Sequence, residues 1–173
     1  MFGAVRIKKG YKETQLTKIF KQYGVKKFYD NVVVPNRSNN DPVSTFVTIV
    51  RHYLEAWAEE SNVSFQNPAS DTITKISGLR YLFYIFPEVC QRILNKSEKL
   101  TKDNFKKIIE QFPVALDLEN VKCVFCDDKS TTTDEMEERS LSFRGEGATI
   151  GLAKKDIAKV IAHDNTVQST SLI

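Results

Sequence analysis

Apolar side chains recur at helical spacing along most of the chain, and the clearest case begins at Asp41. Asp41 is a good N-terminal cap, and Pro42 suits the first helical position because its missing N–H group has no intrahelical partner there. The apolar face of this helix consists of Val43, Phe46, Val47, Val50, Leu54, Trp57 and Ala58. We expect this face to lie in the core and the helix to end near residues 61–62.

Three further helices are predicted in the first two-thirds of the chain. One runs from about Lys12 to Tyr23 and is followed by Gly24, which suits a left-handed C-terminal residue. Another starts near Asp71 and is apolar almost all round over residues 81–86, so it is expected to be the central helix. Pro87 either kinks it or begins the next helix. A helix capped by Thr101 turns four side chains inward: Phe105, Ile108, Ile109 and Phe112.

The remaining pattern is less regular. The short apolar runs 32–34 and 121–125 read as strands or extended segments, and a last helix is expected to end near His163–Asp164. The predicted fold class is therefore mainly α: one compact domain of about five to six helices over residues 1–164, with at most a small strand pair. Residues 165–173 are predicted to form a flexible tail.

The composition indicates a soluble globular protein. The chain has 173 residues, of which 41% are hydrophobic and 27% charged. No run approaches the ~18 apolar residues that a membrane span needs. The first residues lack the apolar stretch of a secretion signal. We therefore predict a cytoplasmic protein with no membrane partner.

Charge is unevenly distributed along the chain. The net charge is +3, but residues 1–30 carry eight basic side chains against two acidic ones, and residues 127–139 carry six acidic side chains against two basic ones. A basic segment of this kind is typical of a surface that binds nucleic acid, although it can equally be an ordinary solvated face. The candidate nucleic-acid-binding residues are Lys12, Lys18, Lys21, Lys26 and Lys27.

A glycine-rich turn offers a weaker phosphate site. Its glycines follow the pattern Gly145-x-Gly147-x-x-x-Gly151 at a helix start, where free N–H groups favour an anion. The pattern lacks the Gly-Lys-Ser/Thr ending of the phosphate-binding loop, and Glu146 opposes a phosphate. The candidate phosphate-binding residues are Arg144, Gly145, Gly147 and Lys154. The alternative is a tight turn with close helix packing.

Catalytic and metal-binding patterns are sparse. Cys123 and Cys126 form a Cys-x-x-Cys pair, a spacing found in zinc and redox sites, but no second pair accompanies it. The pair also fits two half-buried thiols in a packed segment. The two histidines form no Ser/His/Asp arrangement, and His163 is expected to interact with a helix C-terminus. We predict a non-enzymatic protein with no metal and no cofactor.

Three segments resemble a known family. They are the helix opening 41–46 leading to Trp57, the segment 74–83 (TKISGLRYLF), and the segment 143–151 (FRGEGATIG). Together they resemble the C-terminal helical half of DGQHR-domain proteins, a family that includes a transcriptional regulator of bacterial DNA phosphorothioation. The Asp-Gly-Gln-His-Arg motif itself is missing, so no active-site residue is carried over. The resemblance implies a mobile-element or phage-defence setting.

Two functions follow as expectations. The first is a DNA-associated or regulatory module that contacts the phosphates of duplex DNA through the basic N-terminal helix. The second is a protein-interaction module, the detached half of a two-chain assembly with a companion chain, based on the aromatic-rich segment 81–86. A nucleotide-binding enzyme using Arg144 and Lys154 is a third reading.

Overall fold

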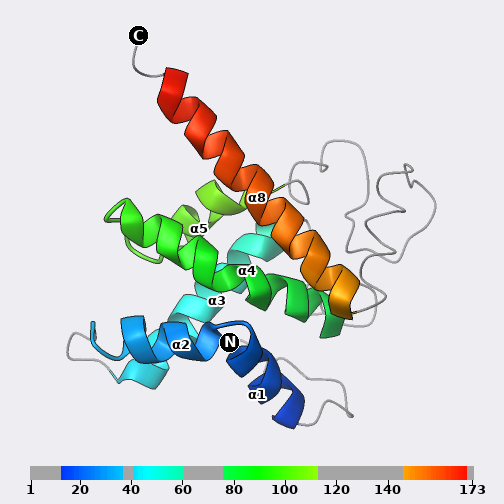
Figure 1. Cartoon of the computed structure of the whole chain (residues 1–173). Helices are drawn as coiled ribbons and strands as arrows, with labels where there is room; N and C mark the ends of the chain where they lie inside the picture. The colour runs from blue at the N-terminus through cyan, green and yellow to red at the C-terminus, as the bar shows by residue number, and fades with distance from the viewer. Residues whose placement is uncertain (1–12, 37–40, 61–75, 113–145, 171–173) are drawn as a thin grey trace.

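The computed structural model describes residues 13–36, 41–60, 76–112 and 146–170, and these ranges are mainly helical (Figure 1). Their elements in chain order are α1 (Glu13–Gln22), α2 (Val25–Phe28), the π-helix η1 (Tyr29–Val33), α3 (Pro42–Glu60), α4 (Ile76–Asn95), α5 (Lys102–Ile109) and α8 (Glu146–Thr170). Within these ranges there is no strand, so the mainly α fold class is confirmed. Val32 and Val33 of the run 32–34, predicted as a strand or extended segment, lie in η1 instead, and the run 121–125 lies outside the described residues.

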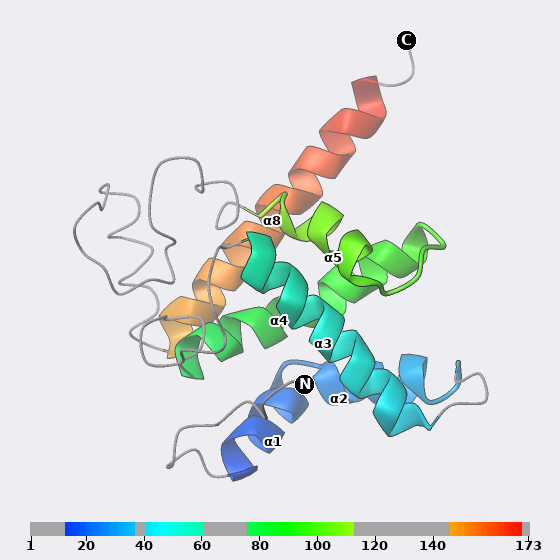
Figure 2. The ribbon, with the colours of Figure 1, turned by 180° about the vertical axis from the view of Figure 1, so that it is seen from behind.

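Helix α4 is the centre of the molecule, as its apolar sequence predicts. It contacts α1, α2, α5 and α8. Figure 1 shows α8 crossing in front of α4, and the reverse view in Figure 2 brings α3 to the front. Pro87 lies inside α4 and starts no new helix, since the helix continues to Asn95. Buried residues lie on both sides of Pro87. Their packing stabilises the helical conformation at the proline.

Helix α3 begins as predicted, but part of its predicted core face is wrong. The Ser44 N–H donates a hydrogen bond to Asp41 Oδ2 at 2.9 Å, which confirms the N-terminal cap. Val43 and Val47, however, are 56% and 59% exposed. The buried residues of α3 are Tyr53, Ala56 and Trp57, because α3 packs against α5 and η1.

Edge-to-face aromatic pairs connect the helices in the core. Tyr53 contacts the rings of Phe86 and Phe105 at centroid distances of 5.0 and 5.4 Å. Its hydroxyl donates a hydrogen bond of 2.7 Å to the Leu82 carbonyl, so a buried polar group is satisfied. Helix α5 is capped by Thr101, and its four predicted core residues are all buried.

The last helix is longer than the sequence pattern predicts. It runs from Glu146 to Thr170, so the predicted end near Asp164 is wrong. The extension contains no glycine or proline that would end a helix. Figures 1 and 2 both show its C-terminal part extending away from the other helices. The predicted flexibility of residues 165–173 stays a prediction.

Candidate nucleic-acid interface

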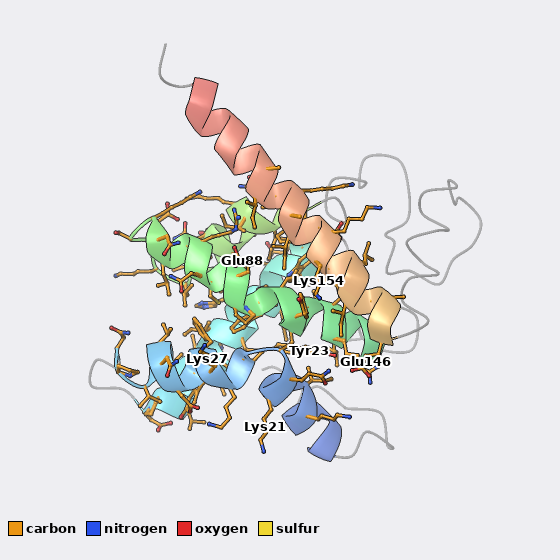
Figure 3. All side chains as sticks on the ribbon, in the orientation of Figure 1. Lys21, Tyr23, Lys27, Glu88, Glu146 and Lys154 are labelled. Atoms are coloured by element: carbon orange, nitrogen blue, oxygen red, sulfur yellow. The ribbon has the colours of Figure 1, made fainter. Side chains whose placement is uncertain are left out.

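The basic residues of α1 and α2 lie on the outside of the molecule. Ile19 and Tyr23 are buried, and the ring centroids of Phe20 and Phe83 are 4.9 Å apart. These residues mark the side of α1 that packs on the core. Lys18 and Lys21 therefore lie on the outer side and are exposed, as the helical pattern predicts. Figure 3 shows Lys21 pointing away from the body of the molecule.

A left-handed glycine separates α1 from α2 and orients the second pair of lysines. Gly24 has a φ of +78°, a conformation that side chains with a Cβ atom rarely adopt. The short helix that follows buries Val25 and Phe28 and leaves Lys26 and Lys27 exposed. The left-handed conformation predicted for Gly24 is thus confirmed.

The lysines of the candidate interface differ in their ion pairing. Lys26 forms an ion pair with Asp30 one turn further along. Among the described residues, Lys18, Lys21 and Lys27 form no ion pair. Lys12 lies outside the described residues. We call the three unpaired residues, Lys18, Lys21 and Lys27, the basic face.

The lysines of α5 offer a contrast. Lys102 and Lys106 are 2.7 and 3.2 Å from the Glu59 carboxylate, and Lys106 is also 3.3 Å from Glu60. Hydrogen bonds from Lys102 and then Lys106 lower the pKa of Glu59. These cations already have partners on α3, so they are less available to an external phosphate.

The described residues include only part of the phosphate site predicted at the glycine-rich turn. Arg144 and Gly145 lie outside them. Gly147 and Gly151 are exposed on α8, and a Cβ atom added to either would meet no atom within 4 Å. The alternative of close helix packing at these two glycines is therefore wrong. Lys154 is exposed about two turns beyond Glu146, apart from Lys21 and Lys27 (Figure 3).

Glu146 turns toward α1 and α4. One carboxylate oxygen, Oε1, accepts hydrogen bonds from Gln22 Nε2 at 3.1 Å and from the Tyr23 hydroxyl at 3.3 Å. The other, Oε2, lies 3.2 Å from an Arg80 Nη atom. Figure 3 shows Tyr23 and Glu146 side by side where α1, α4 and α8 meet. Sequence analysis missed this cluster, although Arg80 is a single charge within an apolar segment, which indicates a partner.

The cluster stabilises the ionised form of Glu146. The Gln22 hydrogen bond and the charge of Arg80 lower the pKa of the Glu146 carboxyl, and Lys18 acts in the same direction. Burial, and secondarily the Glu146 charge, raise the pKa of Tyr23. The stability from Glu146 is present above the unfolded carboxyl pKa of about 4.3 and is lost as the pH falls through the lower folded value.

Of the histidine and cysteine side chains, the structure describes those of His52 and Cys90. His52 is half-buried, with Nδ1 3.2 Å from the Leu100 carbonyl oxygen. His163 lies seven positions before the end of α8, so the helix C-terminus predicted beside it is wrong. Burial raises the pKa of the Cys90 thiol well above its usual value, which makes it a poor nucleophile.

The described part of the chain holds no cluster of three or more His, Cys, Asp or Glu side chains that could bind a metal ion. Cys123 and Cys126 lie outside it. No helix within the described ranges is long and apolar enough to cross a bilayer.

No protein-family model matches the sequence, and neither a curated protein nor a solved structure is detectably similar to it.

Proposed function

We propose that this protein is a non-enzymatic, DNA-associated module that contacts backbone phosphates through the basic face of α1 and α2. The observation that supports the proposal most directly is the pairing of its lysines. Lys18, Lys21 and Lys27 are exposed and form no ion pair among the described residues, whereas Lys102 and Lys106 on α5 are bound to acids. An unpaired surface lysine is available for a phosphate.

The strength of such binding follows from the number of cations. Each neutralised phosphate releases condensed counterions, so the logarithm of the binding constant falls by about 0.9 per contact for each tenfold rise in salt. Three contacts would weaken binding roughly 40-fold between 50 and 200 mM salt. Lysines without base-reading side chains give no sequence preference. The proposed binding is therefore weak, salt-dependent and independent of sequence.

The biological setting in this proposal rests on the resemblance to DGQHR-domain proteins. A regulator of DNA modification or phage defence meets duplex DNA in the bacterial cytoplasm, which fits a basic face without catalytic groups. This setting and location stay predictions.

The test is fluorescence anisotropy with a labelled duplex at about 50 and about 200 mM salt. The variant is Lys21→Glu/Lys27→Glu, because Lys18 also stabilises Glu146 and should stay intact. We expect at least about tenfold weaker binding at low salt and a salt slope reduced by about two. The matched control, Lys96→Glu/Lys99→Glu, makes the same charge change on exposed residues between α4 and α5. Equal loss in both variants, or none in either, contradicts the proposal.

A protein-interaction module is the second candidate. Its sequence basis is weakened, because Tyr81, Phe83 and Phe86 are buried within this chain. A different observation favours it: Val43 and Val47, one turn apart on α3, are both more than half exposed. Sedimentation equilibrium distinguishes the candidates. A concentration-dependent mass that Val43→Ser/Val47→Ser abolishes supports self-association, and a constant monomer mass counts against it.

A further inference from the structure

Four side chains lie around the Glu146 carboxylate at the start of α8. Two of them donate hydrogen bonds to it, and two carry a positive charge. Gln22 and Tyr23 donate to Glu146 Oε1, and Arg80 contacts Oε2. Lys18 adds a positive charge close enough to lower the pKa of this carboxyl. We call Lys18, Gln22, Tyr23 and Arg80 the anion cradle. Two cations, an amide and a hydroxyl around one anion form the set of groups that also binds phosphate in proteins.

The guanidinium of Arg80 has binding capacity that Glu146 does not use. Its contact with Glu146 involves one terminal nitrogen, 3.2 Å from Oε2. Its Nε atom is buried and makes no hydrogen bond among the described residues. A buried donor without an acceptor costs free energy, so the site gains if a ligand supplies an oxygen. Arginine commonly binds phosphate with two nitrogens at once.

A phosphate group matches this cradle better than a carboxylate does. It carries more oxygens, so it can accept from both Arg80 nitrogens and still accept from Gln22 and Tyr23. The start of α8 also favours an anion, because the helix dipole is positive at its N-terminus. Glu146 is 39% exposed, so an anion can reach and replace it from solvent.

We propose that Lys18, Gln22, Tyr23 and Arg80 form a binding site for a phosphate group, and that the Glu146 carboxylate occupies this site in the absence of phosphate. A phosphate that enters displaces Glu146 and releases the contact of α8 with α1. The site goes beyond the proposed function, since it is built from different residues except for Lys18 and accepts a free phosphate without DNA.

The test compares the affinity of three proteins for inorganic phosphate by isothermal titration calorimetry, with chloride added to hold the ionic strength constant. If Glu146 fills the cradle about nine-tenths of the time, removing its charge raises the affinity about tenfold. Glu146→Gln should therefore bind phosphate about tenfold more tightly than the native chain. Glu146→Gln/Arg80→Gln should lose that gain. A Glu146→Gln affinity equal to or below the native one overturns the proposal.

A matched control excludes a general charge effect. Glu88→Gln removes one negative charge from α4, where Glu88 pairs with Arg92. Its phosphate affinity should equal that of the native chain, and a tenfold gain there would also overturn the proposal. Circular dichroism checks that each variant is folded. Should Glu146→Gln unfold, Lys18→Gln in the native background replaces it, and phosphate must then raise its melting temperature less than that of the native chain.

A second probe separates the two sources of phosphate. If Glu146→Gln also binds a short duplex more tightly, the cradle accepts a phosphodiester of DNA. If only inorganic phosphate gains, the ligand is a free phosphate or a phosphate monoester. Failure of the basic face appears separately, in the Lys21→Glu/Lys27→Glu variant, because neither residue belongs to the cradle.

Discussion

Single valines show how burial differs from what the apolar pattern predicts. Val47 belongs to the predicted core face of α3 but is 59% exposed, whereas Val89 in α4 is fully buried. The pattern is the same for both residues, since each recurs with apolar neighbours at helical spacing. The difference arises because α4 is covered by several helices, whereas the first turns of α3 are covered on the side of Phe46, whose ring contacts Tyr29 and Phe86, and Val47 lies off that side.

The same substitution at these two positions should have very different effects. Val89→Ala removes two buried methyl groups and leaves a cavity, so we expect a loss of about 2 kcal/mol in the free energy of unfolding. Val47→Ala should change it by less than about 0.5 kcal/mol. Urea denaturation measures both. A similar loss at the two positions would mean that Val47 is covered in solution.

The sequence predicts the exposure of the lysines of α1, but it does not predict the position of the Glu146 side chain. Exposure of Lys18 and Lys21 follows from the helical period, because both lie off the apolar stripe of α1. Exposure of Lys27 does not follow from it, because Lys27 lies in the four-residue helix α2, beyond the predicted helix. The position of Glu146 does not follow from it either, because its partners come from two other helices. Sequence reasoning identified Glu146 only as a charge opposed to phosphate, whereas the structure places it among cations.

At the scale of the element, a buried polar contact joins the central helix to the last one. The Tyr81 hydroxyl of α4 donates a hydrogen bond of 2.7 Å to Asp156 Oδ2 of α8, and both residues are fully buried. A hydrogen bond from a hydroxyl to a carboxylate is stronger than one between two neutral groups. This contact fixes the rotation of α8 about its axis against α4.

Removing that hydroxyl should destabilise the protein. Tyr81→Phe takes one donor from a buried carboxylate, so we expect a loss of about 1–3 kcal/mol. The control is Tyr84→Phe in the same helix, since Tyr84 is half-buried and its hydroxyl makes no hydrogen bond among the described residues. Its effect should stay below about 0.5 kcal/mol. Thermal unfolding of the two variants compares them, and equal losses would contradict this role for Tyr81.

At the scale of the whole molecule, the helices form one core around α4, and α8 extends beyond it. Among its described side chains, the buried ones end with Val160, while the helix continues to Thr170. Figures 1 and 2 show that the last turns lie apart from the other helices. We therefore expect the core to be independent of these turns.

Truncation should separate the packed from the extended part of α8. A chain that ends at Asp164 should melt within about 3 °C of the full chain, because it retains every α8 residue described as buried. A chain that ends at Gly151 loses Leu152, Ala153, Asp156 and Val160 and should not fold cooperatively. Differential scanning calorimetry measures both. A large loss at Asp164 would show that the last turns contribute to the core.

The sequence by itself determined the helices that carry strong local signals. The Asp41 cap, the Thr101 cap, Gly24 and the apolar period act within a few residues, so they predict the helical class, the central place of α4 and the exposure of Lys18 and Lys21. Only the tertiary structure decided which side of α3 is covered, how far α8 reaches and where Glu146 points. These depend on contacts between residues far apart in the chain, such as Arg80 with Glu146 and Tyr81 with Asp156, and no local pattern encodes such contacts.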